Sequence, residues 1–151
     1  MIGEVKDTDY KGSISFAPNE LKRGDTFSPK MSGIMTSSNG DRMTIRGFMN
    51  FGPNQQRIFE INPIALDSLN NGYWELELEF VMRLDGTSGQ VLSSGNFQMC
   101  QNIASNNNSI AGTGYNGVEP LNTFSSNIFS VNYTGNIDSF ICFQSVLTKI
   151  H

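Results

Sequence analysis

The carboxylates Glu75, Glu77 and Glu79 have the spacing that could do chemistry, because they alternate along one segment. In a β-strand such residues share one face, at intervals of roughly 7 Å. Two carboxylates across a cleft can hydrolyse a glycosidic bond, and several oxygens together can bind calcium. The residues between them are apolar, so the alternation predicts the solvent-exposed face of an amphipathic strand. We therefore expect no catalytic residues, and a glycosidase is an alternative that detectable hydrolysis of a sugar would establish.

The sequence contains few histidine and cysteine residues that could act in catalysis or metal binding. His151 is the single histidine and stands at the end of the chain, where order is usually lost. Cys100 and Cys142 lie in apolar stretches, where a thiol packs as a small hydrophobe, and one disulfide between them is left open. These three residues are too few for a four-ligand zinc site. We expect a non-enzymatic protein with no metal and no cofactor.

The polar stretch from Gln101 to Asn116 is rich in asparagine and glycine and has no periodicity. We expect a long exposed loop here, and many loops of this length bind ligands. The possible ligand contacts are Tyr115, Asn106, Asn107 and Asn108. A rigid aromatic beside adaptable polar residues makes a recognition surface. Trp74, in contrast, is in register with apolar neighbours, and we expect it in the core rather than stacked on a sugar.

The amino-acid composition limits the classes of protein to which the chain can belong. With 151 residues, 38% hydrophobic and 11% aromatic, the chain is expected to fold as one domain. A net charge of −4 opposes binding to a phosphate backbone, so no nucleic acid is expected. No apolar run approaches the roughly 18 residues of a membrane span, and no secretory signal is visible. Charged residues make up only 16% of the chain, so the surface is polar without being strongly ionic.

Period-two alternation of apolar and polar residues predicts strands separated by turns. The clearest pair, 74–83 and 90–100, should form an antiparallel hairpin across the turn at 85–89. A second pair is expected at 127–133 and 137–150. Shorter strands are expected at 12–16, 26–36, 43–51 and 57–62. With almost no helical pattern, the predicted fold class is all-β, an antiparallel sandwich or barrel.

The last predicted strand is apolar on both faces. One face is expected to carry Phe140, Cys142, Val146 and Ile150. The opposite face carries the possible subunit interface, which consists of Ile141, Phe143 and Leu147. A strand that is apolar on both sides is either central in a sandwich or pressed against another subunit.

The order of motifs between Pro18 and Ile150 resembles a known group of proteins. The matching segments are Pro18–Leu21, Thr26–Met35 with its central Ser32-Gly33, Asn39–Asp41, Gly72–Gly89 and Gly95–Phe97. Together they resemble the jelly-roll domains at the C-terminal ends of tail-fibre, head-fibre and minor structural proteins of bacteriophages and other large DNA viruses. The architecture is similar to tumour-necrosis-factor-like sandwiches. The residues that match the group's pattern act as scaffold: Trp74, Arg83, Gly86, Gly89, Gly95 and Phe97.

The resemblance implies an antiparallel jelly-roll sandwich that forms a homotrimer on the capsid or tail surface of a virion. Its role would lie in virion assembly or in host-receptor attachment. Residues 1–17 are expected to be a docking segment, and residues 18–151 the jelly-roll domain. The implied partners are copies of the chain, other virion proteins, and a host-surface glycan or receptor. The alternative is a carbohydrate-binding, lectin-like module, because the same sandwich can support that function.

Overall fold

Every regular element that the structure describes is a β-strand. The computed structural model describes residues 2–4, 13–50, 55–66, 68–100 and 109–150. In chain order the strands are β1 (Ile2–Glu4), β2 (Ser13–Phe16), β3 (Thr26–Ser37), β4 (Arg42–Met49), β5 (Gln56–Ala65), β6 (Leu69–Leu84), β7 (Gln90–Cys100), β8 (Ser109–Pro120), β9 (Asn127–Gly135) and β10 (Ser139–Ile150). The predicted all-β class is confirmed.

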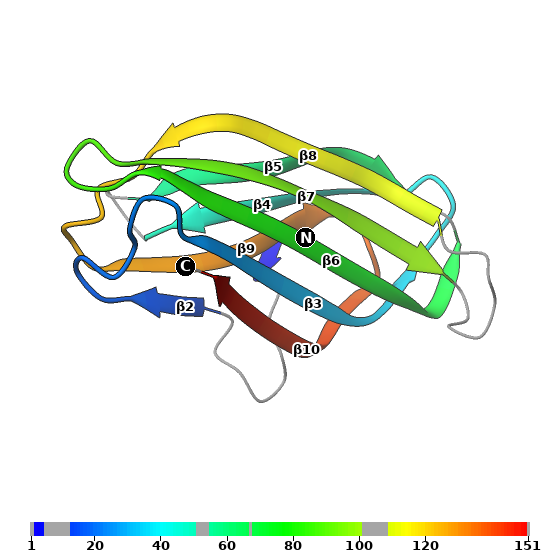
Figure 1. The fold of residues 1–151 in the computed structure, drawn as a ribbon. Coiled ribbons are helices and arrows are strands. Elements are labelled where there is room, and N and C mark those ends of the chain that lie inside the picture. Colours follow the sequence, from blue (N-terminus) through cyan, green and yellow to red (C-terminus); the bar gives the residue numbers. More distant parts are fainter. Residues whose placement is uncertain (1, 5–12, 51–54, 67, 101–108, 151) are drawn as a thin grey trace.

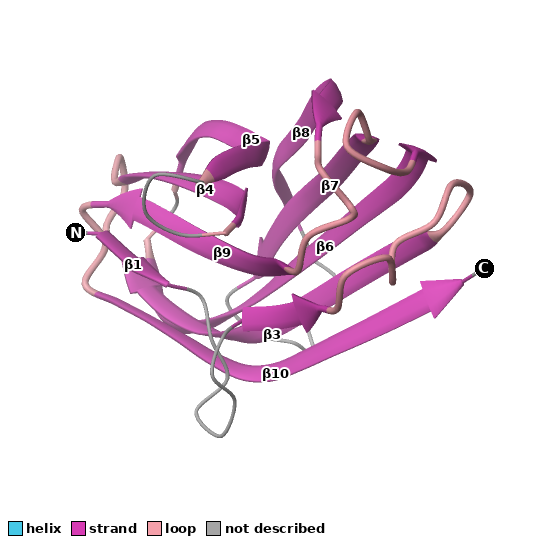
Figure 2. Cartoon of the chain, turned by 90° about the vertical axis from the view of Figure 1, so that its left-hand side faces the viewer, coloured by secondary structure: helices cyan, strands magenta, loops and turns pink. Residues whose placement is uncertain are grey.

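The strands form two antiparallel sheets, which we call the first and the second sheet. The first sheet has the order β1-β9-β4-β5, and β2 also pairs with β9. The second sheet has the order β10-β3-β6-β7-β8. Figure 1 gives the course of the chain, and Figure 2 shows the second sheet as a curved layer beneath and beside the first. In the described residues each sheet ends in edge strands that pair on one side only, so neither closes on itself as a barrel.

One aromatic core joins the two sheets. Phe27 and Phe80 of the second sheet stack with ring centroids 4.7 Å apart. The ring of Phe129, from β9 of the first sheet, meets Phe80 edge-on at 5.0 Å. Phe59 of β5 also reaches Phe80. These contacts bury the apolar face of each sheet against the other, which is the arrangement of a sandwich.

The segment predicted to dock the domain contributes strands to the first sheet. β1 and β2 both pair with β9. Phe16, at the end of β2, is buried and lies 5.0 Å from Phe27, centroid to centroid. The docking role concerns a partner and stays a prediction.

The hairpin predicted from alternation is confirmed as β6 and β7. Trp74 pairs with Met99, and Glu79 pairs with Ser94. Along β6 the apolar side chains from Trp74 to Phe80 are buried, whereas Glu77 and Glu79 are exposed. Trp74 is therefore a core residue, as expected.

The second predicted pair is wrong, because β9 and β10 belong to different sheets. β9 pairs with β4, and β10 pairs with β3. Two residues of the connection form hydrogen bonds with different sheets. The N–H of Asn136 donates to the carbonyl of Arg42, in the first sheet, and the N–H of Asp138 donates to the carbonyl of Thr36, in the second. A Gly-Asn turn is compatible with a hairpin and with a crossing between layers, so the local sequence could not separate the two.

The alternation predicted for the last strand is corrected by a β-bulge. Cys142 pairs with Gly33 and Gln144 with Ser32, which leaves Phe143 as the extra residue. A bulge reverses the facing of every residue beyond it. Leu147 therefore packs against the core, while Val146 is 46% exposed. β10 is also an edge strand rather than a central one.

The loop predicted from Gln101 to Asn116 is wrong from Ser109 onward, because β8 begins there. Tyr115 lies within this strand, and its backbone pairs with Ser94 of β7. Without apolar alternation, the stretch carried no strand signal, and pairing with β7 supplies the order instead. Asn106, Asn107 and Asn108 lie outside the described residues.

Trp74 and Gly33 attach the edge strand β10 to the rest of its sheet. The indole N–H of Trp74 donates to the carbonyl of Ile34 at 3.2 Å and to that of Ile141 at 3.1 Å. Its ring stacks on Phe140 at 4.4 Å between centroids. A Cβ atom on Gly33 would clash with the backbone carbonyl oxygen of Ile141. The absence of a side chain at Gly33 is therefore what admits the carbonyl that Trp74 binds.

We expect Gly33→Ala to lower the free energy of unfolding by about 3 kcal/mol or more, because the methyl group would strike backbone rather than a movable side chain. The measurement is urea unfolding followed by tryptophan fluorescence. Gly47→Ala is the matched control, since a Cβ there meets only side-chain atoms of Phe129 and Phe59, at 3.2 and 3.3 Å. It should cost about 1 kcal/mol. Equal losses in the two variants would contradict the assignment.

Candidate functional site

A hollow of about 630 Å³ lies on the outer face of the second sheet. Residues of β3, β6, β7 and β10 line it. Its exposed carboxylates, Glu77 and Glu79, project from the side of β6 opposite the buried Leu76 and Leu78. A volume of this size is within the range of small-molecule sites. The hollow is therefore our candidate functional site.

Two neighbouring rungs of the sheet build the hollow, because paired residues of antiparallel strands share a face. The first rung carries the short side chains of Thr148, Ser28 and Ser94 beside Glu79. The second rung carries Val146, Lys30, Glu77 and Asn96. The short side chains leave the space, and the longer ones of the second rung form its wall.

The hollow lies over an interruption in the sheet. Pairing between β3 and β6 lapses at Ser28 and Pro29 and resumes at Lys30. Proline has no N–H to donate to a neighbouring strand, which explains the lapse. On the other side, a Cβ on Gly95 would come within 2.5 Å of the Leu78 side chain, so glycine lets β7 pack closely there. Backbone choices at two positions thus shape the floor.

Negatively charged side chains outnumber positively charged ones at the site. The ammonium of Lys30 lies 3.1 Å from a carboxylate oxygen of Glu77 and 3.6 Å from one of Glu75. The hydrogen bond from Lys30 lowers the pKa of Glu77, and the same bond raises the pKa of Lys30. Among the described residues no cation pairs with Glu79. Three carboxylates facing one ammonium leave an excess of negative charge on this face.

Hydrogen-bond acceptors outnumber free donors in the hollow. The side-chain oxygen of Asn96 is buried and accepts no hydrogen bond within the described part of the chain. Such an atom carries a desolvation cost that a donor on a ligand would relieve. Carboxylates accept only, and hydroxyls can do either. The arrangement suits a ligand rich in O–H and N–H groups.

A row of exposed apolar side chains, which we call the β10 row, adjoins the hollow. Ile141, Phe143 and Val146 are 38%, 53% and 46% exposed. They project from an edge strand, and Val146 also lines the hollow. Apolar side chains grouped at a sheet edge are typical of surfaces that contact another chain.

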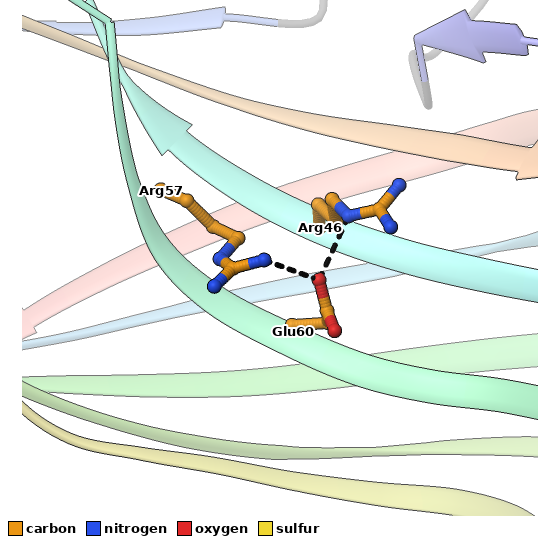
Figure 3. Close-up of polar contacts among 3 residues, drawn as sticks. All are labelled: Arg46, Arg57 and Glu60. Carbon is orange, nitrogen blue, oxygen red and sulfur yellow. Dashed lines mark hydrogen bonds and ion pairs between the residues drawn. The ribbon is translucent and has the colours of Figure 1, made fainter.

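The first sheet carries a different charged cluster on its outer face. Arg46 of β4 and Arg57 of β5 both donate to one carboxylate oxygen of Glu60, each at 2.8 Å (Figure 3). Glu60 is largely shielded, with 19% of its side chain exposed. Charge-assisted bonds of this kind hold neighbouring strands in register. We interpret the cluster as a structural link between β4 and β5.

The structure brings some of the predicted residues together and separates others. Tyr115 is next to the hollow by its backbone pairing with Ser94. Cys100 and Cys142 are both buried, and no disulfide joins them. Within the described ranges no three His, Cys, Asp or Glu side chains are grouped to hold a metal ion. Nor does any described segment form a helix long and apolar enough to cross a membrane.

Sequence reasoning missed most residues of the hollow. Ser94 and Asn96 could have been predicted from the sequence, because the predicted hairpin already sets them opposite Glu79 and Glu77. No local sequence pattern indicated that Lys30 and Thr148 belong to the site, since β3 and β10 are far in sequence from the β6–β7 hairpin. Their proximity depends on β3 lying between β6 and β10.

No family model and no curated protein matches the chain. Among solved structures, the CBM2 module of the evolved Dit of Lactobacillus casei BL23 phage J-1 is similar with a TM-score of 0.26 and 10% identity, over 85% of this chain and 70% of that one. The polysaccharide lyase family 18 protein aly-SJ02 (r-CATD) is similar with a TM-score of 0.21 and 10% identity, over 91% and 96%.

We expect Lys30→Met to raise the pKa of Glu77, because the hydrogen bond and the positive charge that lower it disappear. The measurement is an NMR titration of the side-chain carboxyls. In the unchanged protein a lowered pKa means that Glu77 contributes stability above its unfolded pKa and loses it as the pH falls through its folded value. The variant should lose less stability on acidification.

Lys22→Met is the control, since Lys22 is exposed and its side chain makes no ion pair with a described residue. It should leave the titration of Glu77 unchanged. An unshifted Glu77 in Lys30→Met would show that the ion pair does not set this pKa.

Proposed function

We propose that the protein is a non-enzymatic structural component of a virus particle, on the capsid or tail surface, which assembles as a homotrimer and acts in virion assembly or host attachment. The observation that carries the proposal is the β10 row, three apolar side chains grouped on an edge strand. The virion setting rests on the sequence resemblance to phage and large-virus structural domains.

The order of strands supports a jelly roll. β10-β3-β6 in the second sheet faces β2-β9-β4-β5 in the first, and the connections from β2 to β3, β3 to β4, β5 to β6, β8 to β9 and β9 to β10 cross between the sheets. Jelly rolls are double-sheet sandwiches built from such crossing connections. β7 and β8 extend the second sheet beyond this set.

The β10 row supports self-association. Val146 takes the place that we had expected for Leu147, because the bulge at Phe143 reverses the facing beyond it. Aromatic and aliphatic side chains of low charge are what interface cores contain. Edge strands with apolar side chains associate unless something covers them, and closed rings of identical copies provide such cover.

A carbohydrate-binding module is the second candidate function. The hollow favours it, because carboxylate, amide and hydroxyl groups lie together above a partly apolar floor. A few placed polar groups on an apolar base are typical of small-ligand sites.

We expect the protein to run at three chain masses in size-exclusion chromatography with light scattering, and Phe143→Asp to dissociate it. Burying a phenylalanine contributes about 1.5 to 3 kcal/mol, so each interface should weaken by roughly tenfold to a hundredfold. Phe124→Asp is the matched control, since Phe124 is 56% exposed but lies on the segment between β8 and β9. It should leave the mass unchanged.

A stable monomer at micromolar concentration would overturn the trimer, as would equal effects of the two substitutions. The virion setting has a separate test. Cross-linking and mass spectrometry of purified particles should find this chain beside other surface proteins, and its absence from the particles would count against the setting.

A further inference from the structure

We infer that the hollow on the outer face of the second sheet binds an amino sugar, a saccharide whose hydroxyl and ammonium groups donate to its acceptors. The inference rests on the carbohydrate-binding candidate and adds a ligand class to it. The charges and the acceptors of Glu79 and Asn96 lie on β3, β6 and β7, whereas Val146 and Thr148 of β10 also line the hollow, so the test is repeated on a variant of the β10 row.

Hydroxyl recognition follows from the acceptors. Glu79 has no cationic partner among the described residues, and the side-chain oxygen of Asn96 is buried without a donor. The two residues lie on adjacent rungs, since they pair with Ser94 and Glu77. Two hydroxyl groups of a saccharide can each donate to one of these acceptors. Ser28, Ser94 and Thr148 supply further hydroxyls along the first rung.

The preference for an amine follows from the charge. Lys30 is already held by Glu75 and Glu77, so its ammonium offers little to an anionic ligand. The excess negative charge of the face attracts an ammonium group and repels a carboxylate. An amino sugar should therefore bind more tightly than its neutral analogue, and a uronic acid more weakly than both.

The dimensions favour a sugar over the side chain of a basic peptide. The hollow spans four strands and has a volume of about 630 Å³, and its apolar lining includes Val146, which is 46% exposed. A lysine side chain would bring the same cation, but it would leave the hydroxyls and Asn96 without partners. We therefore assign the saccharide and treat a peptide as an outcome of the test.

The experiment is an NMR titration of the full chain at pH 6 with three β-1,4-linked disaccharides: di-glucosamine, cellobiose and di-glucuronic acid. At this pH the amines and the carboxylates are both charged. We expect di-glucosamine to bind about five- to tenfold more tightly than cellobiose, with shifts centred on Ser94 and Asn96. Di-glucuronic acid should not bind.

Two variants locate the effect. Glu79→Gln keeps the size of the side chain and removes its charge, so the preference for the amine should fall while cellobiose still binds. Ser94→Leu fills the first rung and should abolish binding of both sugars. Both positions are exposed, so the fold should persist, which the spectra verify. Glu119→Gln is the control, because Glu119 lies on β8 outside the hollow.

Every remaining outcome of the titration contradicts one specific claim about the ligand. Equal affinity for di-glucosamine and cellobiose would overturn the amino-sugar inference and leave the carbohydrate-binding candidate standing. No binding of any disaccharide at millimolar concentration would overturn both. Binding of tri-lysine without binding of sugars would replace the saccharide by a basic peptide. Repeating the titration with Phe143→Asp separates these results from the oligomeric state.

Discussion

The bifurcated hydrogen bond of the Trp74 indole, shared between the carbonyls of Ile34 and Ile141, is the contact on which the second sheet depends. It ties the central strand β6 to β3 and to the edge strand β10 at one point. Gly33 makes it possible, because any side chain there would collide with the Ile141 carbonyl. A buried indole N–H needs an acceptor, and an edge carbonyl needs a donor, so each satisfies the other.

The surface features follow from the β-bulge that lies next to that attachment. Two residues beyond Ile141, Phe143 is one residue more than β3 can pair, and this bulge reverses the facing of the rest of β10. Val146 therefore joins Ile141 and Phe143 on the outside. The same reversal places Thr148 beside Ser28, where a short side chain leaves the hollow open. One irregularity thus positions both the proposed interface and part of the proposed ligand site.

The chain carries few charges, and the placement of those it has is informative. On the first sheet, Glu60 is neutralised by two arginines and links neighbouring strands. On the second sheet, Lys30 engages only part of the carboxylate row and leaves an acidic face. A weakly charged surface with one acidic hollow suits a domain that contacts copies of itself and selects ligands by donor groups and positive charge.

Local alternation determined a good part of this fold. The hairpin of β6 and β7, the burial of Trp74 and the exposure of Glu77 and Glu79 follow from a period of two, because facing and register inside a hairpin are set by nearby residues. Only the tertiary structure decided that β10 leaves β9 for the other sheet, that Phe143 is bulged, and that Lys30 and Thr148 meet the hairpin. These features depend on pairing between strands distant in sequence, which no local pattern encodes.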